Sequence, residues 1–192
     1  DNPVVSGGFS WGAVQAAWIT APVECWAPLL WLSYMLDVEL FGLEPWGFHL
    51  VNVLLFACNA GLLFWLVGRW TGRWGPALAV ALLWALHPAR VESVAWIAER
   101  KDVLSGLFFL LCLGAYVQSR ERGGERAGWA WVALGRLGMG MLVNPALVMV
   151  PFVLLLLDIW PLGRMPVDNV EFCRPMPRLV LEKWRFWRVA VG

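Results

Sequence analysis

Residues 47–67 read GFHLVNVLLFACNAGLLFWLV and contain no Asp, Glu, Lys or Arg. A run of roughly 20 uncharged and mostly apolar residues is long enough to cross the hydrocarbon core of a bilayer as an α-helix. Arg69 and Arg73 follow this run closely and close it with charge. The stretch therefore predicts a transmembrane helix and an integral membrane protein.

The composition of the whole chain agrees with this prediction. Of its 192 residues, 60% are hydrophobic and 15% are charged, whereas about a quarter of the residues of a soluble domain are charged. The net charge of +1 hides a segregation of opposite charges along the sequence and does not indicate a nucleic-acid partner. The four cysteines lie far apart without metal-ligand spacing, so no metal site is predicted.

Further apolar segments predict about five spans in an all-α polytopic bundle covering residues 47–160. The stretch from Ala127 to Leu157 is too long for one crossing, and Asn144-Pro145 interrupts it near its middle. Charged residues 100–102 precede the third span. After the first span, the predicted spans lie near residues 74–87, 103–118, 127–143 and 145–160.

Residues 1–46 lack a convincing span and are rich in Gly, Pro and acidic residues. Two short helices, Trp11 to Ile19 and Trp26 to Met35, are predicted there, with tryptophans placed to lie at headgroup level. They are interpreted as interfacial helices on the extracytoplasmic side. The alternative is that they are loop helices packed on the spans. Residues 161–192 are predicted to form a basic cytoplasmic tail.

The distribution of basic residues predicts the orientation. Arg69, Arg73, the three arginines of residues 120–126 and the six basic residues after residue 160 fall on one face, which makes eleven of fifteen. The opposite face holds only Arg90, Arg100 and Lys101. Since Lys and Arg concentrate on the cytoplasmic side, the N-terminus is predicted to be extracytoplasmic.

Polar residues inside the predicted spans need partners. His49, Asn52 and Asn59 lie on the first span and are expected to form interhelical hydrogen bonds rather than to contact a ligand. Arg136 lies within the fourth span, where an intramembrane charge is a functional candidate. Asp158 is its expected partner if the two come close, and both could instead reach the inner headgroups.

Small residues on the spans predict close helix packing. Gly61 and Gly68 share the first span, while Gly135, Gly138 and Gly140 share the fourth. We interpret these glycines as packing residues without a chemical role.

The densest polar cluster runs from residue 87 to residue 102, between two predicted spans on the outer face. Basic side chains there could hold a phosphate, and a carboxylate could act as a base. The alternative is a loop helix whose charges neutralise one another. The candidate ligand-binding residues for a lipid phosphate or a sugar are Arg100, Lys101, His87 and Asp102, and the candidate catalytic carboxylates are Glu92 and Asp37.

Several stretches resemble a known family. The likeness covers nearly the whole chain and is most specific in VESVAWIAERKDVLS, residues 91–105. On these residues the chain resembles the membrane part of bacterial tetratricopeptide-repeat proteins similar to protein O-mannosyltransferases of the GT-C glycosyltransferase superfamily. The other matching runs are residues 31–37, 41–43, 49–52 and 151–158.

The resemblance implies a helical membrane domain that uses a polyprenyl-phosphate sugar and transfers it to a hydroxyl on the outer face. The family's catalytic acid belongs to an acidic loop motif just upstream of the point where Asp1 begins, so the chain is expected to be an internal segment. The family pattern implies polar residues at five positions where this chain differs. The pattern has His at the positions of Ala27 and Phe56 in this chain. It has Thr at the positions of Leu30 and Met149, and Lys at the position of Asn144.

Two functions follow as hypotheses. In the first, the chain is a non-catalytic helical subunit that is derived from a GT-C scaffold and packs against other membrane proteins. In the second, it is the membrane segment of an active protein O-glycosyltransferase that depends on a polyprenyl-phosphate sugar. Membrane lipids and other membrane subunits are the expected partners. No cofactor is expected apart from a bound lipid or polyprenyl phosphate, and the expected location is the bacterial cytoplasmic membrane.

Overall fold

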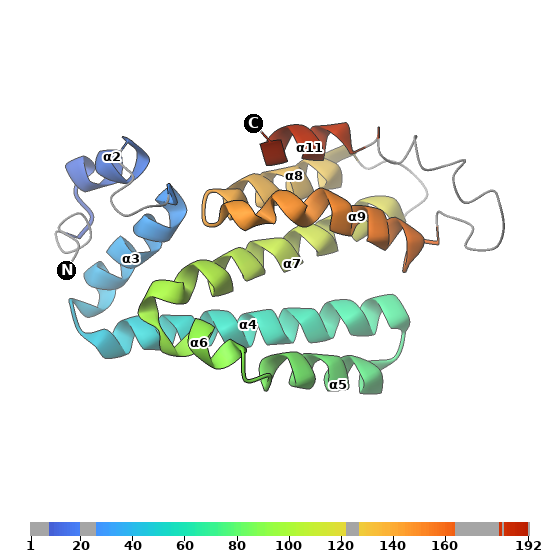
Figure 1. Cartoon of the computed structure of the whole chain (residues 1–192), viewed down its shortest axis with the longest axis horizontal. Coiled ribbons are helices and arrows are strands. Elements are labelled where there is room, and N and C mark those ends of the chain that lie inside the picture. Colours follow the sequence, from blue (N-terminus) through green and yellow to red (C-terminus); the bar gives the residue numbers. More distant parts are fainter. Residues whose placement is uncertain (1–7, 20–25, 122–126, 164–180, 182, 192) are drawn as a thin grey trace.

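The computed structural model describes residues 8–19, 26–121, 127–163, 181 and 183–191. All regular secondary structure in these residues is helical (Figure 1). The first elements are α2 (Trp11–Ile19), α3 (Pro28–Phe41), α4 (Pro45–Thr71), α5 (Trp74–Ala85), α6 (Arg90–Ala95) and η1 (Ile97–Glu99). They are followed by α7 (Arg100–Glu121), α8 (Ala127–Met141), η2 (Pro145–Met149), α9 (Val150–Ile159) and α11 (Trp184–Val191).

Two helical segments of the described chain are long and apolar enough to cross a bilayer. Helix α4 has 27 residues and contains an 18-residue stretch with a mean hydropathy of 2.2, and residues 97–120, which include most of α7, contain an 18-residue stretch with a mean hydropathy of 1.5. Only 17% of the apolar window of α4 is buried within the protein. A long apolar helix that leaves most of its surface uncovered suits lipid better than water. These features fit a membrane protein.

The remaining predicted spans form shorter helices. Helix α5 has 12 residues, α8 has 15 and α9 has 10, whereas a helix that crosses the bilayer needs about 20 residues. A break after α8 separates it from η2 and α9, and there the Asn144 side chain accepts a hydrogen bond from the Ala146 N–H at 3.0 Å. The predicted interruption at Asn144-Pro145 is therefore confirmed, but a total of about five spans is not.

The N-terminal helices agree in position with the prediction. Helix α2 has the predicted bounds, whereas α3 begins at Pro28 and continues six residues beyond Met35. Proline at the first helical turn suits the start of α3, and Gly42 with a φ of 68° ends it. Trp11 is 77% exposed. A position at the membrane interface remains a prediction.

Helix α7 lies at the centre of the bundle, with α4 and α5 on one side and α8, α9 and α11 on the other (Figure 1). A large apolar cluster joins α7 to α8, α9 and α11 around Tyr116, Leu137 and Leu154. A second cluster packs α3 against the start of α4 and Val143.

Two of the predicted packing glycines allow close contacts. A methyl group at Gly68 would lie 2.4 Å from the Trp74 ring, and one at Gly140 would lie 2.4 Å from Leu147. A methyl group at Gly61 or Gly135 would meet no atom of the described residues within 4 Å. The predicted packing role is therefore wrong for Gly61 and Gly135, because they face open space.

Candidate functional site

A buried arginine at the end of the polar cluster, Arg100, connects helices α3, α4 and α7. Arg100 starts α7, although the sequence predicted that residues 100–102 precede the helix. The helix can begin here because the Arg100 guanidinium is fully buried and forms an ion pair with the Asp37 carboxylate of α3. Its Nε donates a hydrogen bond to Asn52 Oδ1 of α4 at 2.7 Å, and its Nη2 donates to the Phe48 carbonyl at 2.9 Å. The predicted interhelical hydrogen bonding of Asn52 is therefore confirmed.

The Tyr34 ring covers this ion pair, with its centroid 4.7 Å from Cζ of Arg100. Burial raises the pKa of the Asp37 carboxyl above its ordinary value, and the Arg100 guanidinium opposes this shift by stabilising the carboxylate. Burial also raises the pKa of the Tyr34 phenol to about 12. The phenol therefore stays protonated at neutral pH and donates a hydrogen bond to the Ile97 carbonyl at 2.6 Å.

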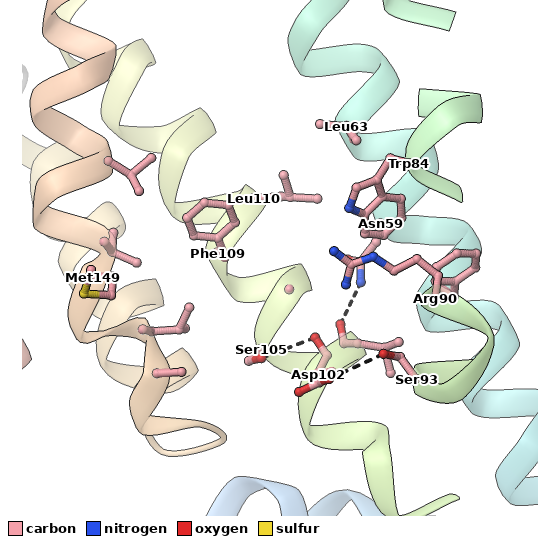
Figure 2. Close-up of a pocket in the computed structure, with 17 residues that line it drawn as sticks. Asn59, Leu63, Trp84, Arg90, Ser93, Asp102, Ser105, Phe109, Leu110 and Met149 are labelled. Atoms are coloured by element: carbon pink, nitrogen blue, oxygen red, sulfur yellow. Dashed lines mark hydrogen bonds between the residues drawn. The ribbon is translucent and has the colours of Figure 1, made fainter. Parts of the chain in front are cut away.

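The polar cluster of residues 87–102 also borders a cavity of about 550 Å³. This cavity lies between α4, α6, α7 and the η2–α9 segment. Its polar part is lined by Arg90, Ser93, Asp102 and Ser105 (Figure 2). The Ser93 hydroxyl donates a hydrogen bond to Asp102 Oδ2 at 3.4 Å. Apolar side chains form most of the remaining wall. They include Leu63, Phe109, Leu110, Leu147, Val150 and Val153.

Arg90 is the cation of this cavity. Figure 2 shows its side chain extending from α6 toward α7. Its guanidinium lies 5.0 Å from the Trp84 ring centroid, and Trp84 stacks on Phe56 with centroids 5.1 Å apart. A guanidinium binds phosphate through charge-assisted hydrogen bonds, and an aromatic face can pack against a sugar ring or a hydrocarbon chain. The cavity thus combines an anion-binding group with hydroxyls, a carboxylate and an apolar wall.

The structure separates the residues that were predicted to form one site. Asp102 lines the cavity, whereas Arg100 and Asp37 are buried in their ion pair outside its lining. Lys101 is half-exposed and forms an ion pair with Glu99 at 3.4 Å. The two remaining candidates, Glu92 and His87, are exposed and do not line the cavity. The Nδ1 atom of His87 accepts a hydrogen bond from the Ala89 N–H at 3.2 Å.

The sequence prediction missed Arg90, Ser105 and the apolar wall. The i, i+3 spacing of Arg90 and Ser93 on one helix indicates a shared face and could have identified the pair. It could not show that Asp102 joins them, because this depends on the break at Trp96, where ψ is 122° and α6 ends.

Asn59 supports the cavity from α4. Its Nδ2 donates a hydrogen bond to the Val103 carbonyl of α7 at 2.7 Å (Figure 2). This confirms the predicted interhelical hydrogen bonding of Asn59. His49, by contrast, is exposed on the surface of α4.

The expected pair of Arg136 and Asp158 is wrong. Arg136 Nη1 donates a hydrogen bond to the Leu111 carbonyl at 2.9 Å. The buried Asp158 carboxylate accepts a hydrogen bond from the Tyr116 hydroxyl at 2.8 Å and forms an ion pair with Lys183. The prediction failed because the position of Lys183, 25 residues further along the chain, cannot be read from helical spacing.

The chain is similar to a group of animal proteins. It is 42% identical over 110 residues to protein O-mannosyl-transferase tmtc2 of Xenopus laevis, covering 57% of this chain and 13% of that protein. It is 39% identical over 121 residues to the TMTC2 protein of Homo sapiens, covering 62% and 14%. With Tmtc2 of Drosophila melanogaster it shares 33% identity over 145 residues, covering 70% and 15%. No protein-family profile matches the chain, and no solved structure matches it.

Homologues of this chain are therefore protein O-mannosyl-transferases. This supports the predicted likeness to a membrane glycosyltransferase family, although these relatives are animal proteins rather than bacterial ones. The aligned part of the chain spans only about one seventh of the length of the relatives named here. The similarity concerns a helical membrane segment. The location of this chain in a bacterial cytoplasmic membrane remains a prediction.

Proposed function

We propose that this chain forms part of the membrane domain of a protein O-glycosyltransferase-like protein and that its cavity holds the phosphate and sugar of a polyprenyl-phosphate donor. The observation that carries this proposal is the cavity beside α7, in which the polar side chains of Arg90, Ser93, Asp102 and Ser105 share a lining with many apolar residues. A lipid-linked sugar has the same division, with a charged and hydroxylated head on a hydrocarbon chain.

Each group of the cavity has a role in this proposal. Arg90 holds the phosphate, the Asp102 carboxylate accepts hydrogen bonds from sugar hydroxyls, and the serine hydroxyls donate hydrogen bonds to the sugar or accept them from it. The wall formed by Phe109, Leu147 and neighbouring residues packs against the first isoprene units. The names of the homologues support this assignment, because they describe transferases of mannose to protein.

In this proposal Asp102 binds the sugar, and neither of the two predicted catalytic carboxylates, Asp37 and Glu92, lines the cavity. Asp37 is paired with Arg100 and buried, and Glu92 is exposed outside the cavity lining. General acid–base catalysis needs a carboxylate within hydrogen-bond reach of the acceptor oxygen. We therefore expect this chain by itself to bind a donor without transferring the sugar.

A purely structural role is the second candidate, and one observation favours it. Two of the positions that depart from the family pattern, Phe56 and Met149, line the cavity. An apolar residue in place of His or Thr removes a polar contact from a donor site while keeping the fold. In that case the chain packs against other membrane subunits and binds no donor.

Photo-crosslinking separates the two candidates. A photoreactive residue replaces Val153, which lines the cavity, and in a control it replaces Val53, which is exposed on α4 outside the lining. The probe is polyprenyl-phosphate mannose in nanodiscs, with unlabelled donor and polyprenol as competitors. If the cavity binds the donor, the residue at position 153 should crosslink to the probe, and unlabelled donor should suppress this crosslinking. The residue at position 53 should crosslink little. Equal crosslinking at both positions would show ordinary lipid contact and favour the structural role.

A turnover assay with a serine-rich peptide tests the absence of catalysis. We expect no transfer above background. Transfer that is abolished by Glu92→Gln would make Glu92 the base and contradict the proposal.

A further inference from the structure

A basic and aromatic surface lies on α8 and α11, away from the donor cavity. Trp131 of α8 and Trp184, Arg185 and Arg188 of α11 form this surface, which we call the Trp–Arg patch. A hollow of about 470 Å³ lies over it, and Leu134 and Val189 complete its lining. Both tryptophans are about half-exposed or more, although each carries a large apolar ring.

The rings hold the two arginines in place. Cζ of Arg185 lies 5.1 Å from the Trp131 ring centroid and 5.8 Å from that of Trp184, while Cζ of Arg188 lies 5.2 Å from the Trp184 centroid. Such contacts orient a guanidinium without neutralising it. Neither arginine forms an ion pair with an acidic residue within the part of the chain that the structure describes. Two positive charges therefore share one hollow.

The opposite side of α11 fixes the patch to the bundle. Phe186 and Ala190 are buried, and Phe186 packs on Tyr116 with ring centroids 5.9 Å apart. Just before α11, the buried Lys183 forms an ion pair with Asp158 of α9. Because these buried side chains anchor α11 to the bundle, Arg185, Arg188 and Trp184 project from a fixed surface.

We propose that the Trp–Arg patch binds the headgroup of an anionic phospholipid. The guanidiniums of Arg185 and Arg188 donate hydrogen bonds to the phosphate, and the tryptophan rings pack against the glycerol and upper acyl region. Charge complementarity selects this occupant, since two cations beside exposed indole rings suit an anion joined to hydrocarbon. The patch is separate from the donor cavity, so its occupancy does not depend on the proposed donor.

Lipid selectivity tests the proposal. The full chain is purified in mixed micelles with equal amounts of phosphatidylcholine and phosphatidylglycerol, and retained lipid is counted by native mass spectrometry. Wild type is expected to retain phosphatidylglycerol preferentially. Arg185→Gln with Arg188→Gln should lower that preference at least roughly tenfold, because each basic residue near an anionic lipid surface strengthens binding about several-fold. Arg185→Lys with Arg188→Lys should retain most of the preference.

Arg73→Gln is the matched control, because Arg73 is an exposed arginine outside the patch. It should leave the preference unchanged. An equal loss in the Arg73 variant, or an unchanged preference in the double Gln variant, would overturn the proposal. Release of the lipid by millimolar inorganic phosphate would also overturn it, because the patch would then be a general anion site.

Discussion

Arg100 of α7 and Asp37 of α3 form a fully buried ion pair, although 63 residues separate them in the sequence. The guanidinium also bonds to Asn52 of α4, so one side chain holds three helices together. Both residues had been predicted to lie in a ligand-binding or catalytic site. Their position indicates instead that they set the geometry of the polar segment from which Arg90 and Asp102 reach the cavity.

Removing one member of this pair should destabilise the protein strongly. Arg100→Met leaves the Asp37 carboxylate buried without its cation, which typically costs about 3 to 5 kcal/mol. Thermal unfolding in detergent should show a large fall in Tm, and Arg100→Met with Asp37→Leu should recover part of it. Lys101→Met is the neighbouring control, because its ion pair is exposed and contributes about 1 kcal/mol or less. Equal stability of Arg100→Met and wild type would contradict the structural role.

Tyr34 predicts a loss of stability at alkaline pH. Its folded-state pKa of about 12 is above the ordinary value of 10.0, so folding favours the neutral phenol. The resulting stability is fully present below pH 10 and is lost as the pH rises from 10 through 12, by on the order of 2 to 3 kcal/mol. Unfolding measured from pH 8 to 12 should be less pH-dependent for Tyr34→Phe than for wild type. Identical slopes would show that the phenol does not titrate in this way.

Asp158 should couple energetically to Lys183 and not to Arg136. A double-mutant cycle with Asp158→Asn and Lys183→Met should give a coupling energy of at least about 1 kcal/mol, because the two charges form a buried pair. The parallel cycle with Arg136→Leu should be additive within about 0.5 kcal/mol. Strong coupling in the second cycle would restore the pair expected from the sequence.

The contact between α4 and α5 depends on Gly68. Gly68→Ala should destabilise the protein by about 1 to 3 kcal/mol, because its methyl group would clash with the Trp74 ring. Gly61→Ala lies on the same helix, and its methyl group would meet no atom within 4 Å in the part of the chain that the structure describes, so it should be neutral or slightly stabilising. Chemical unfolding of the two variants side by side checks this. A larger effect at Gly61 would be inconsistent with the packing described.

The sequence predicted most of the helices because their signals are local. An uncharged run identifies α4, and Asn144-Pro145 marks the break before α9. The start of α7 was misplaced, because three charged residues usually end an apolar helix, and the partners that make a buried Arg100 acceptable, Asp37 and Asn52, are distant in the sequence.

The candidate site was harder to predict for the same reason. Lys101 and Asp102 are adjacent in sequence, but only Asp102 lines the cavity. Arg90 was overlooked beside the more conspicuous pair of Arg100 and Lys101. The direction of each side chain depends on the break between α6 and η1 and on packing against α4, neither of which has a simple sequence signal.

The assignment of the cavity as a donor site is tested most directly by the affinity of Arg90→Ala for a polyprenyl-phosphate donor. Equilibrium binding of polyprenyl-phosphate mannose to the chain in nanodiscs is measured for wild type, Arg90→Ala and Lys101→Ala. Loss of a charge-assisted phosphate contact typically costs about 1.5 to 3 kcal/mol, so Arg90→Ala should raise Kd about 10- to 150-fold. Lys101→Ala should change it less than about twofold, because Lys101 lies outside the cavity lining. A large loss in Lys101→Ala with an unchanged Kd in Arg90→Ala would contradict the assignment of the cavity as the donor site.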